Sequence, residues 1–157
     1  MQKNNLIIYV SSRNNYDMLE GEVLKNVDSE GFEFINIDDK SCNEEIAKGK
    51  AICKKHNIIF LESKSRGVQM ATQTLIDFIN KNRPDCKWVF CFQHDNYPIS
   101  PNFFSQISKY IEKGKLDDFG ILGFNQVDHG KYTFDGVSDG YSRFMKGEKP
   151  LGMMGLA

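Results

Sequence analysis

The stretch Phe32-Glu-Phe-Ile-Asn-Ile-Asp-Asp-Lys-Ser41 decides the fold of this chain. Its first part, Phe32–Ile37, is rich in aromatic and β-branched side chains and predicts a buried strand. The polar run Asp38-Asp39-Lys40-Ser41 follows at once and predicts the end of that strand. In open α/β sheets, ligands bind at the carboxyl ends of parallel strands, so this polar run is also the first candidate for a binding site.

The segments on either side repeat an alternation of strands and helices. Further apolar runs predict four more strands, at Leu6–Val10, Ile58–Leu61, Trp88–Phe92 and Gly120–Phe124. Apolar residues at helical spacing predict helices after an Asn15 cap, after an Asn43 cap, from Val68 to Ile79 with Pro84 beyond, and after Pro101. This order predicts an α/β fold, a three-layer sandwich with a mostly parallel central sheet and helices on both faces.

The length and the glycine distribution predict one compact domain followed by a tail. A chain of 157 residues with 40% hydrophobic side chains can bury one continuous core. Beyond Asn125, glycines interrupt any long element. We therefore expect an α/β domain over residues 1–125 and an irregular Gly-rich tail over residues 126–157.

Charge and cysteine content exclude several classes of function. The chain has 20 Lys and Arg against 21 Asp and Glu, so no overall charge attracts it to nucleic acid or to an anionic membrane. The opening apolar run is too short for a signal peptide or a transmembrane segment, and we expect a cytoplasmic protein. The four cysteines form no CxxC pair, so we expect reduced thiols rather than disulfides or a zinc site.

Polar side chains follow each of the first four predicted strands, and all four groups would meet at one edge of the sheet. Hydroxyl and amide groups suit a base and a ribose, Arg66 and the helix start after Gly67 suit a diphosphate, and a carboxylate suits a divalent cation. The sequence thus predicts a site for a nucleoside diphosphate in the runs Ser11-Ser-Arg-Asn14, Asp38-Asp-Lys-Ser41, Lys64-Ser-Arg-Gly67 and Gln93-His-Asp-Asn96.

The run Phe34-Ile-Asn-Ile-Asp-Asp-Lys-Ser41 resembles the "hydrophobic strand, Asp-Asp-x-Ser" signature of family two glycosyltransferases with the GT-A fold. Leu6–Asn14 is similar to the opening strand and loop of that family, Ser65-Arg-Gly67 to the glycine before its third helix, and Trp88–Asp95 to the strand that leads into its Asp-x-Asp motif. The resemblance covers Leu6 to Phe124.

The resemblance implies a role for several residues of this chain. It implies that Asp39 hydrogen-bonds the nucleotide base, that Ser11 and Arg13 line the base and the ribose, and that Asp95 ligates Mn²⁺ or Mg²⁺ on the diphosphate. The expected donor is a nucleoside-diphosphate sugar, UDP-linked, and the expected acceptor is an unidentified glycan, lipid or protein. The full set of residues expected to bind the nucleotide is Ser11, Arg13, Asp38, Asp39, Arg66 and Gly67.

The chain departs from the family pattern at two points. Gln93 stands where the first acid of Asp-x-Asp is expected, which leaves Asp95 as the expected metal ligand. The carboxylate base of an inverting transferase has no match, although Asp128, Asp135 and Asp139 are present in the tail.

Three other interpretations stay open on the sequence. In the first, the chain is a catalytically silent module that binds a nucleotide sugar or a glycan, or a fragment that lacks the catalytic base. In the second, Asp38 and Asp39 belong to a turn that caps the next helix. A signalling domain similar to response regulators or flavodoxins has the same alternation, but Ser11 and Ser12 stand where its acidic pair is needed.

Overall fold

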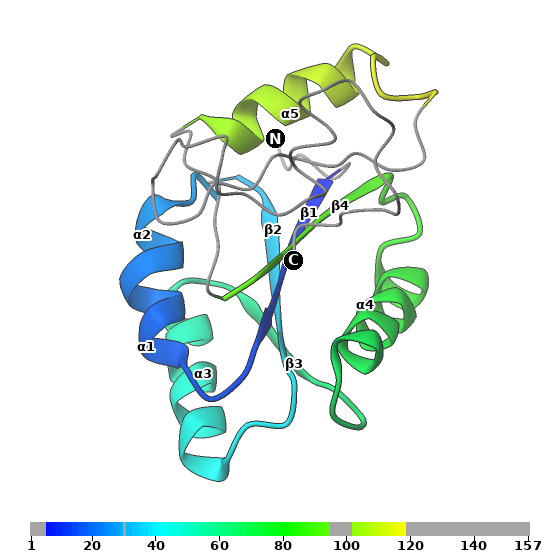
Figure 1. The fold of residues 1–157 in the computed structure, drawn as a ribbon. Coiled ribbons are helices and arrows are strands. Elements are labelled where there is room, and N and C mark those ends of the chain that lie inside the picture. The colour runs from blue at the N-terminus through cyan, green and yellow to red at the C-terminus, as the bar shows by residue number, and fades with distance from the viewer. Residues whose placement is uncertain (1–5, 30, 95–101, 119–157) are drawn as a thin grey trace, which may run out of the picture. The chain divides into compact units, whose positions relative to one another are not determined.

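The computed structural model describes residues 6–29, 31–94 and 102–118. Its centre is a four-stranded sheet in the order β3-β2-β1-β4, in which every neighbouring pair is parallel (Figure 1). This arrangement confirms the predicted α/β class and the parallel sheet. The strands are β1 (Leu6–Ser12), β2 (Glu33–Asp38), β3 (Ile59–Glu62) and β4 (Trp88–Gln93).

The central strand β1 pairs with β2 on one side and with β4 on the other. Backbone hydrogen bonds continue the pairing beyond the strand ends, from Asp39 N to Ser12 O at 2.9 Å, and from His94 N to Ser11 O at 3.2 Å. Ser63 N likewise donates to the carbonyl oxygen of Asp38 at 2.9 Å. The carboxyl ends of the four strands are therefore in register, and the polar residues that follow them begin at a common edge.

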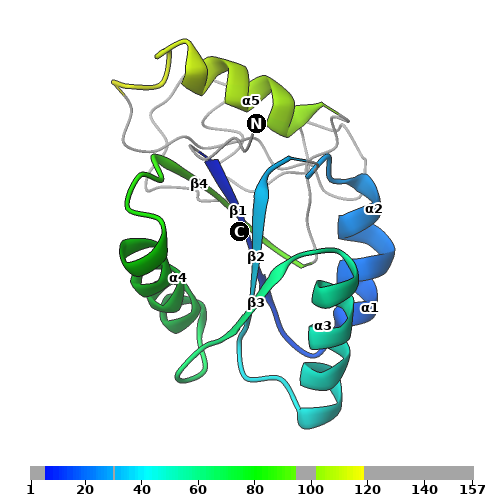
Figure 2. The same ribbon diagram turned by 180° about the vertical axis from the view of Figure 1, so that it is seen from behind.

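Helices cover both faces of the sheet, as Figures 1 and 2 show from opposite sides. Helix α4 (Val68–Asn82) lies on one face. On the other lie α3 (Asn43–Lys55) and a helix made of α1 (Tyr16–Met18), the π-helical turn η1 (Leu19–Val23) and α2 (Leu24–Asn26). Helix α5 (Phe103–Glu112) follows β4. The described helices confirm the predicted three-layer arrangement.

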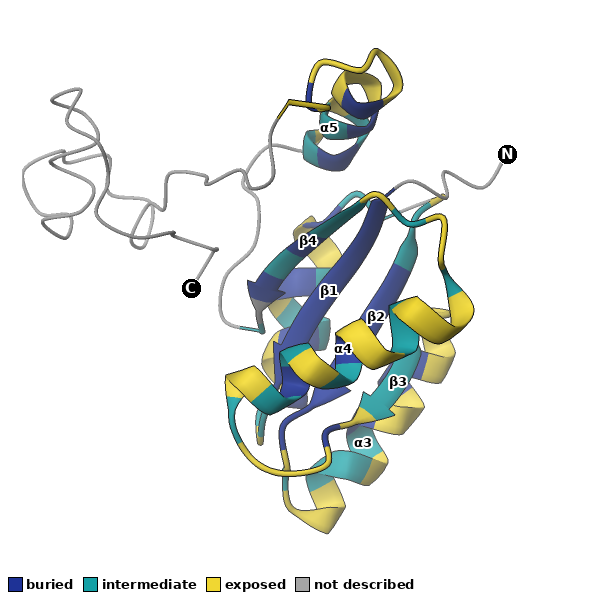
Figure 3. Cartoon of the chain, turned by 90° about the vertical axis from the view of Figure 1, so that its right-hand side faces the viewer, coloured by how far each residue is buried: buried dark blue, intermediate teal, exposed yellow. Residues whose placement is uncertain are grey.

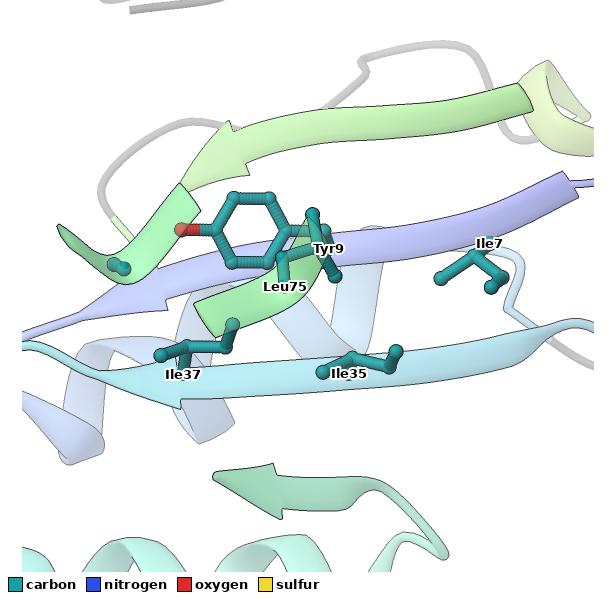
Figure 4. Close-up of a cluster of buried hydrophobic side chains, with 6 residues drawn as sticks. Ile7, Tyr9, Ile35, Ile37 and Leu75 are labelled. Carbon is teal, nitrogen blue, oxygen red and sulfur yellow. The ribbon is translucent and has the colours of Figure 1, made fainter. Parts of the chain in front are cut away.

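The core beneath α4 is made of apolar side chains from β1, β2 and α4. Ile7, Tyr9, Ile35 and Ile37 point toward Leu75 of the helix (Figure 4). Every residue of β1 is buried, because helices cover both of its faces and strands flank both of its edges (Figure 3). A largely apolar strand pattern is what such a central position requires.

Helix α5 is fixed to the sheet by aromatic rings and by a carboxylate. The ring of Phe90 in β4 meets those of Phe103 and Phe104 at centroid distances of 5.0 and 4.9 Å. Asp28, which follows α2, accepts the backbone N–H groups of Phe104 and Ser105 at 3.3 and 3.4 Å. A carboxylate at a helix N-terminus satisfies donors that have no partner within the helix.

The sequence predictions differ from the structure mainly at element ends. Asn15 is the N-cap of α1 as expected, but its side chain makes no capping bond. The N-cap of α3 is Cys42, and Asn43 is already helical, so the predicted Asn43 cap is wrong by one residue. The predicted strand Gly120–Phe124, Pro101 and the boundary between residues 125 and 126 lie outside the described residues. Across the described ranges, no helix is long and apolar enough to span a membrane.

Candidate functional site

The adjacent residues Asp38 and Asp39 project to opposite sides of the carboxyl edge. Successive residues of an extended chain point to opposite faces. Asp38 is completely buried on the side of α3, where it bonds to Tyr16. Asp39 is 7% exposed on the side of α4, where its Oδ1 accepts the backbone N–H of Gly67 at 2.5 Å. The two carboxylates that the sequence places together therefore face two different environments.

On the α3 side, five residues form a connected hydrogen-bond chain, which we call the Tyr16 network. Ser12 Oγ donates to Asn36 Oδ1 at 2.6 Å, and Asn36 Nδ2 donates to the Tyr16 hydroxyl at 3.2 Å. The Tyr16 hydroxyl in turn donates to Asp38 Oδ2 at 2.8 Å, while the backbone N–H of Ser41 donates to Asp38 Oδ1 at 2.9 Å. Both oxygens of Asp38 are thus occupied by groups of the chain itself.

Tyr16 is locked by its surroundings as well as by this network. Its ring lies so close to Gly49 of α3 that a Cβ at that position would stand 2.5 Å from two ring carbons. Its backbone N–H donates to Glu45 Oε2 at 3.0 Å. Burial, followed by the hydrogen bond to Asp38, raises the pKa of Tyr16 well above its usual range, so its hydroxyl stays protonated and remains a donor.

Sequence reasoning did not single out Tyr16 or Asn36. The available signal was Asn36 itself, an amide inside an otherwise apolar strand, because a buried amide needs partners. Asn36 is completely buried, and the network provides those partners.

The loops after β1 and β2 are tied to each other. The backbone N–H of Asn14 donates to Ser41 Oγ at 2.9 Å, and Asn14 Oδ1 accepts the N–H of Cys42 at 2.9 Å. Asn14 and Lys40 both have positive φ values, of 49° and 59°. This reciprocal pairing fixes the backbone next to Arg13.

On the α4 side, five residues gather where α4 begins, and we call them the α4-side cluster: Tyr9, Ser11, Asp39, Gly67 and Thr72. Tyr9 and Ser11 alternate along β1 onto the same face, which α4 covers. Gly67 precedes α4 with φ of +121°, a conformation that favours glycine, and its N-cap position provides no side chain to cap the helix. The cluster therefore combines hydroxyls, a carboxylate and helix N–H groups that lack intrahelical partners.

The structure places most of the predicted nucleotide-binding residues at the α4 side of the carboxyl edge. Ser11 is buried, and Arg13 is half-buried, with its Nε atom enclosed and not hydrogen-bonded to any described residue. Arg66 is exposed next to Gly67. Asp38 is the exception, since its side chain belongs to the Tyr16 network on the other side.

The predicted metal ligand, Asp95, lies outside the described residues, and the side chain of Gln93 is not described either. Within residues 6–29, 31–94 and 102–118, no three His, Cys, Asp or Glu side chains gather as a metal centre. His94 Nδ1 lies 3.4 Å from the carbonyl oxygen of Ser11. The described side chains alone do not form a ligand set for a divalent cation.

Comparison with known proteins relates the chain to a glycosyltransferase fold. No family model matches it, and no curated protein matches its sequence. Two crystal structures of S. aureus TarS, one of residues 1–349, are similar with a TM-score of 0.53 and 13% identity. The similarity covers 78% and 83% of this chain, but only 38% and 24% of the TarS chains.

At this identity the comparison shows the fold. The chain is an α/β protein with an all-parallel sheet, and its structural neighbours have the GT-A-like fold of glycosyltransferases. The chain spans little more than a third of the shorter TarS structure.

Proposed function

We propose that this chain is the donor-binding part of a glycosyltransferase, which binds a UDP-linked sugar at the α4 side of the carboxyl edge. The observation that supports this most is the hydrogen bonding of the Asp39 carboxylate. One carboxylate oxygen is held by Gly67 N, which fixes the side chain, and no described residue donates to the other oxygen, Oδ2. A fixed carboxylate with an available oxygen suits the N–H group of a uracil base.

The neighbouring groups suit the rest of such a nucleotide. Ser11 lies near the end of β1 and Arg13 directly follows the strand, and they would supply a hydroxyl and a guanidinium to the base and ribose. Arg66 and the first turn of α4, which has no side-chain cap, supply positive charge and N–H donors for the diphosphate. We assign Asp38 to the support of this edge rather than to the ligand, because both of its oxygens accept hydrogen bonds within the chain.

The proposal retains Mn²⁺ or Mg²⁺ at Asp95, where the positive charge of the ion would stabilise the negative charge of the leaving diphosphate. The base that deprotonates the acceptor is unassigned, and Asp128, Asp135 and Asp139 lie outside the described residues. A second function, a module that binds the nucleotide sugar without transferring it, is favoured by Gln93 in place of an acid. Assays of binding and of sugar transfer on the same preparation separate the two.

The test is calorimetric titration of UDP into the wild type and into Asp39→Asn. Asparagine keeps an oxygen for the Gly67 N–H group but removes the carboxylate, so we expect UDP affinity to fall by about 1–3 kcal/mol. The matched control is Asp85→Asn, an equal loss of charge at an exposed position, which should leave affinity unchanged. Equal UDP affinity in Asp39→Asn and the wild type would reduce Asp39 to a turn residue.

A further inference from the structure

The hydroxyl of Tyr9 is buried without completing a hydrogen bond. Tyr9 is 3% exposed, and its oxygen has no described partner within hydrogen-bond geometry. Figure 4 shows the ring lying along β1 with its oxygen directed toward the carboxyl ends of the strands. An unsatisfied buried hydroxyl costs free energy, and the apolar cluster around the ring would accept phenylalanine equally well. Packing of the core therefore does not explain why this residue is a tyrosine rather than a phenylalanine.

Three members of the α4-side cluster, Ser11, Asp39 and Thr72, act on this hydroxyl. Burial raises the pKa of Tyr9 most. The neighbouring Ser11 hydroxyl lowers it, Cys91 raises it, the Thr72 hydroxyl lowers it, and the Asp39 carboxylate raises it least. Thr72 Oγ1 already donates to the carbonyl oxygen of Val68 at 2.9 Å. Ser11 Oγ is the acceptor that stands between Tyr9 and the edge, because Ser11 is the next residue on the same face of β1.

Tyr16, on the other side of the sheet, provides a comparison, because its buried hydroxyl forms hydrogen bonds within the chain. Its hydroxyl donates to Asp38 and accepts from Asn36. The two tyrosines are both buried against the same sheet, yet of these two only the one on the α3 side has its partners provided by the described chain.

We propose that Tyr9 is a positioning residue of the nucleotide site: its hydroxyl donates to Ser11 Oγ when a nucleotide is bound, so that Ser11 directs its own proton to an oxygen acceptor of the nucleoside. This inference rests on the proposed function. It needs only rotation about the side-chain bonds of Ser11 and of the Tyr9 hydroxyl, and no proton is lost or gained. Tyr9 itself does not touch the ligand, which agrees with its enclosed oxygen.

The experiment compares UDP affinity with stability in Tyr9→Phe. We expect Tyr9→Phe to keep or raise the urea midpoint of unfolding, since it removes an unsatisfied hydroxyl, and to weaken UDP binding about fivefold. Tyr16→Phe should instead lower the urea midpoint, because it removes two hydrogen bonds. Tyr110→Phe, at an exposed position of α5, should change neither quantity.

A double-mutant cycle tests whether Tyr9 acts through Ser11. In the Ser11→Ala background, Tyr9→Phe should have no further effect on UDP affinity. An equal loss in both backgrounds would overturn the proposed contact, and so would unchanged affinity in Tyr9→Phe alone while the wild type binds UDP. In that last case the proposed function would stand. A wild type that binds no nucleoside diphosphate would overturn the proposed function and this inference together.

Discussion

The two sides of the carboxyl edge are built from the same strand ends but are completed differently. On the α3 side, the Tyr16 network satisfies both oxygens of the Asp38 carboxylate, along with the Tyr16 hydroxyl and the Asn36 amide. On the α4 side, Asp39 has one described donor, and the Tyr9 hydroxyl has no hydrogen bond to a described residue. Buried polar groups normally find partners, so the side left incomplete by the described chain is the side suited to a ligand.

Under the proposed function, this difference separates residues that support the edge from residues that recognise the nucleotide. Asp38 and Ser12 face α3 and hold the loops in place, whereas Asp39 and Ser11, each one position away, face α4. A substitution on one side should therefore act mainly on stability, and one on the other mainly on binding.

The largest effect is expected from Asp38→Ala. This change removes the acceptor of both the Tyr16 hydroxyl and the Ser41 N–H group and leaves a cavity at a completely buried position. Each unsatisfied donor costs about 1–3 kcal/mol, so we expect the free energy of unfolding to fall by about 2–5 kcal/mol in urea titrations. If Asp39→Asn proves equally destabilising, the contrast between the two sides fails.

Gly49→Ala should also destabilise the α3 side. A Cβ at this position would lie 2.5 Å from the ring of Tyr16, and that ring is completely buried. We expect a loss of about 1–3 kcal/mol from overpacking, which outweighs the gain of up to about 1 kcal/mol from replacing a helical glycine. Gly21→Ala is the control, since a Cβ at Gly21 would meet no described atom within 4 Å and only the gain applies. Stabilisation in both variants would show that Tyr16 moves freely.

The smallest effect is expected from Glu20, on the surface outside both groups. A hydrogen bond from Lys55, then one from His56, holds the pKa of Glu20 below its ordinary value of 4.5. A carboxyl with a lowered folded pKa stabilises the fold at neutral pH and loses that contribution as pH falls through 4.5 and below. Glu20→Gln should thus slightly reduce the fall in the free energy of unfolding between neutral and acid pH. The effect is small because solvent screens exposed ion pairs. A loss as large as that of Asp38→Ala would place the main stabilising contacts elsewhere.

Most of the fold could be predicted from the sequence because each element has a local signal. The apolar run Trp88–Phe92 predicted β4, and the helical spacing from Val68 to Ile79 predicted α4. The start of α3 was harder, since Cys42 adopts the extended N-cap conformation without a side-chain bond to mark it.

The carboxyl edge of the sheet could be located from the sequence. Which of its residues face α3 and which face α4 was not predicted. The pair Asp38-Asp39 was expected to bind one ligand, although alternation along a strand already directs neighbouring side chains to opposite faces. The contact between Tyr16 and Gly49 depends on how α1 and α3 pack, and no local pattern encodes such a contact. The roles of Ser11, Arg13, Arg66 and Asp95 stay predictions.

The position of β1 at the centre of the sheet has a consequence for the order in which the protein folds. Its pairing with β2 joins Ile7 to Glu33, whereas its pairing with β4 joins Leu6 to Trp88, much farther along the chain. Closing the longer loop costs more chain entropy and is slower. While the chain is being synthesised, β1 therefore presents an unpaired edge until β4 has been made, and an open strand edge favours association with other chains. We therefore expect the pairing of β4 with β1, including that of Gln93 with Ser11, to form after the pairing of β1 with β2.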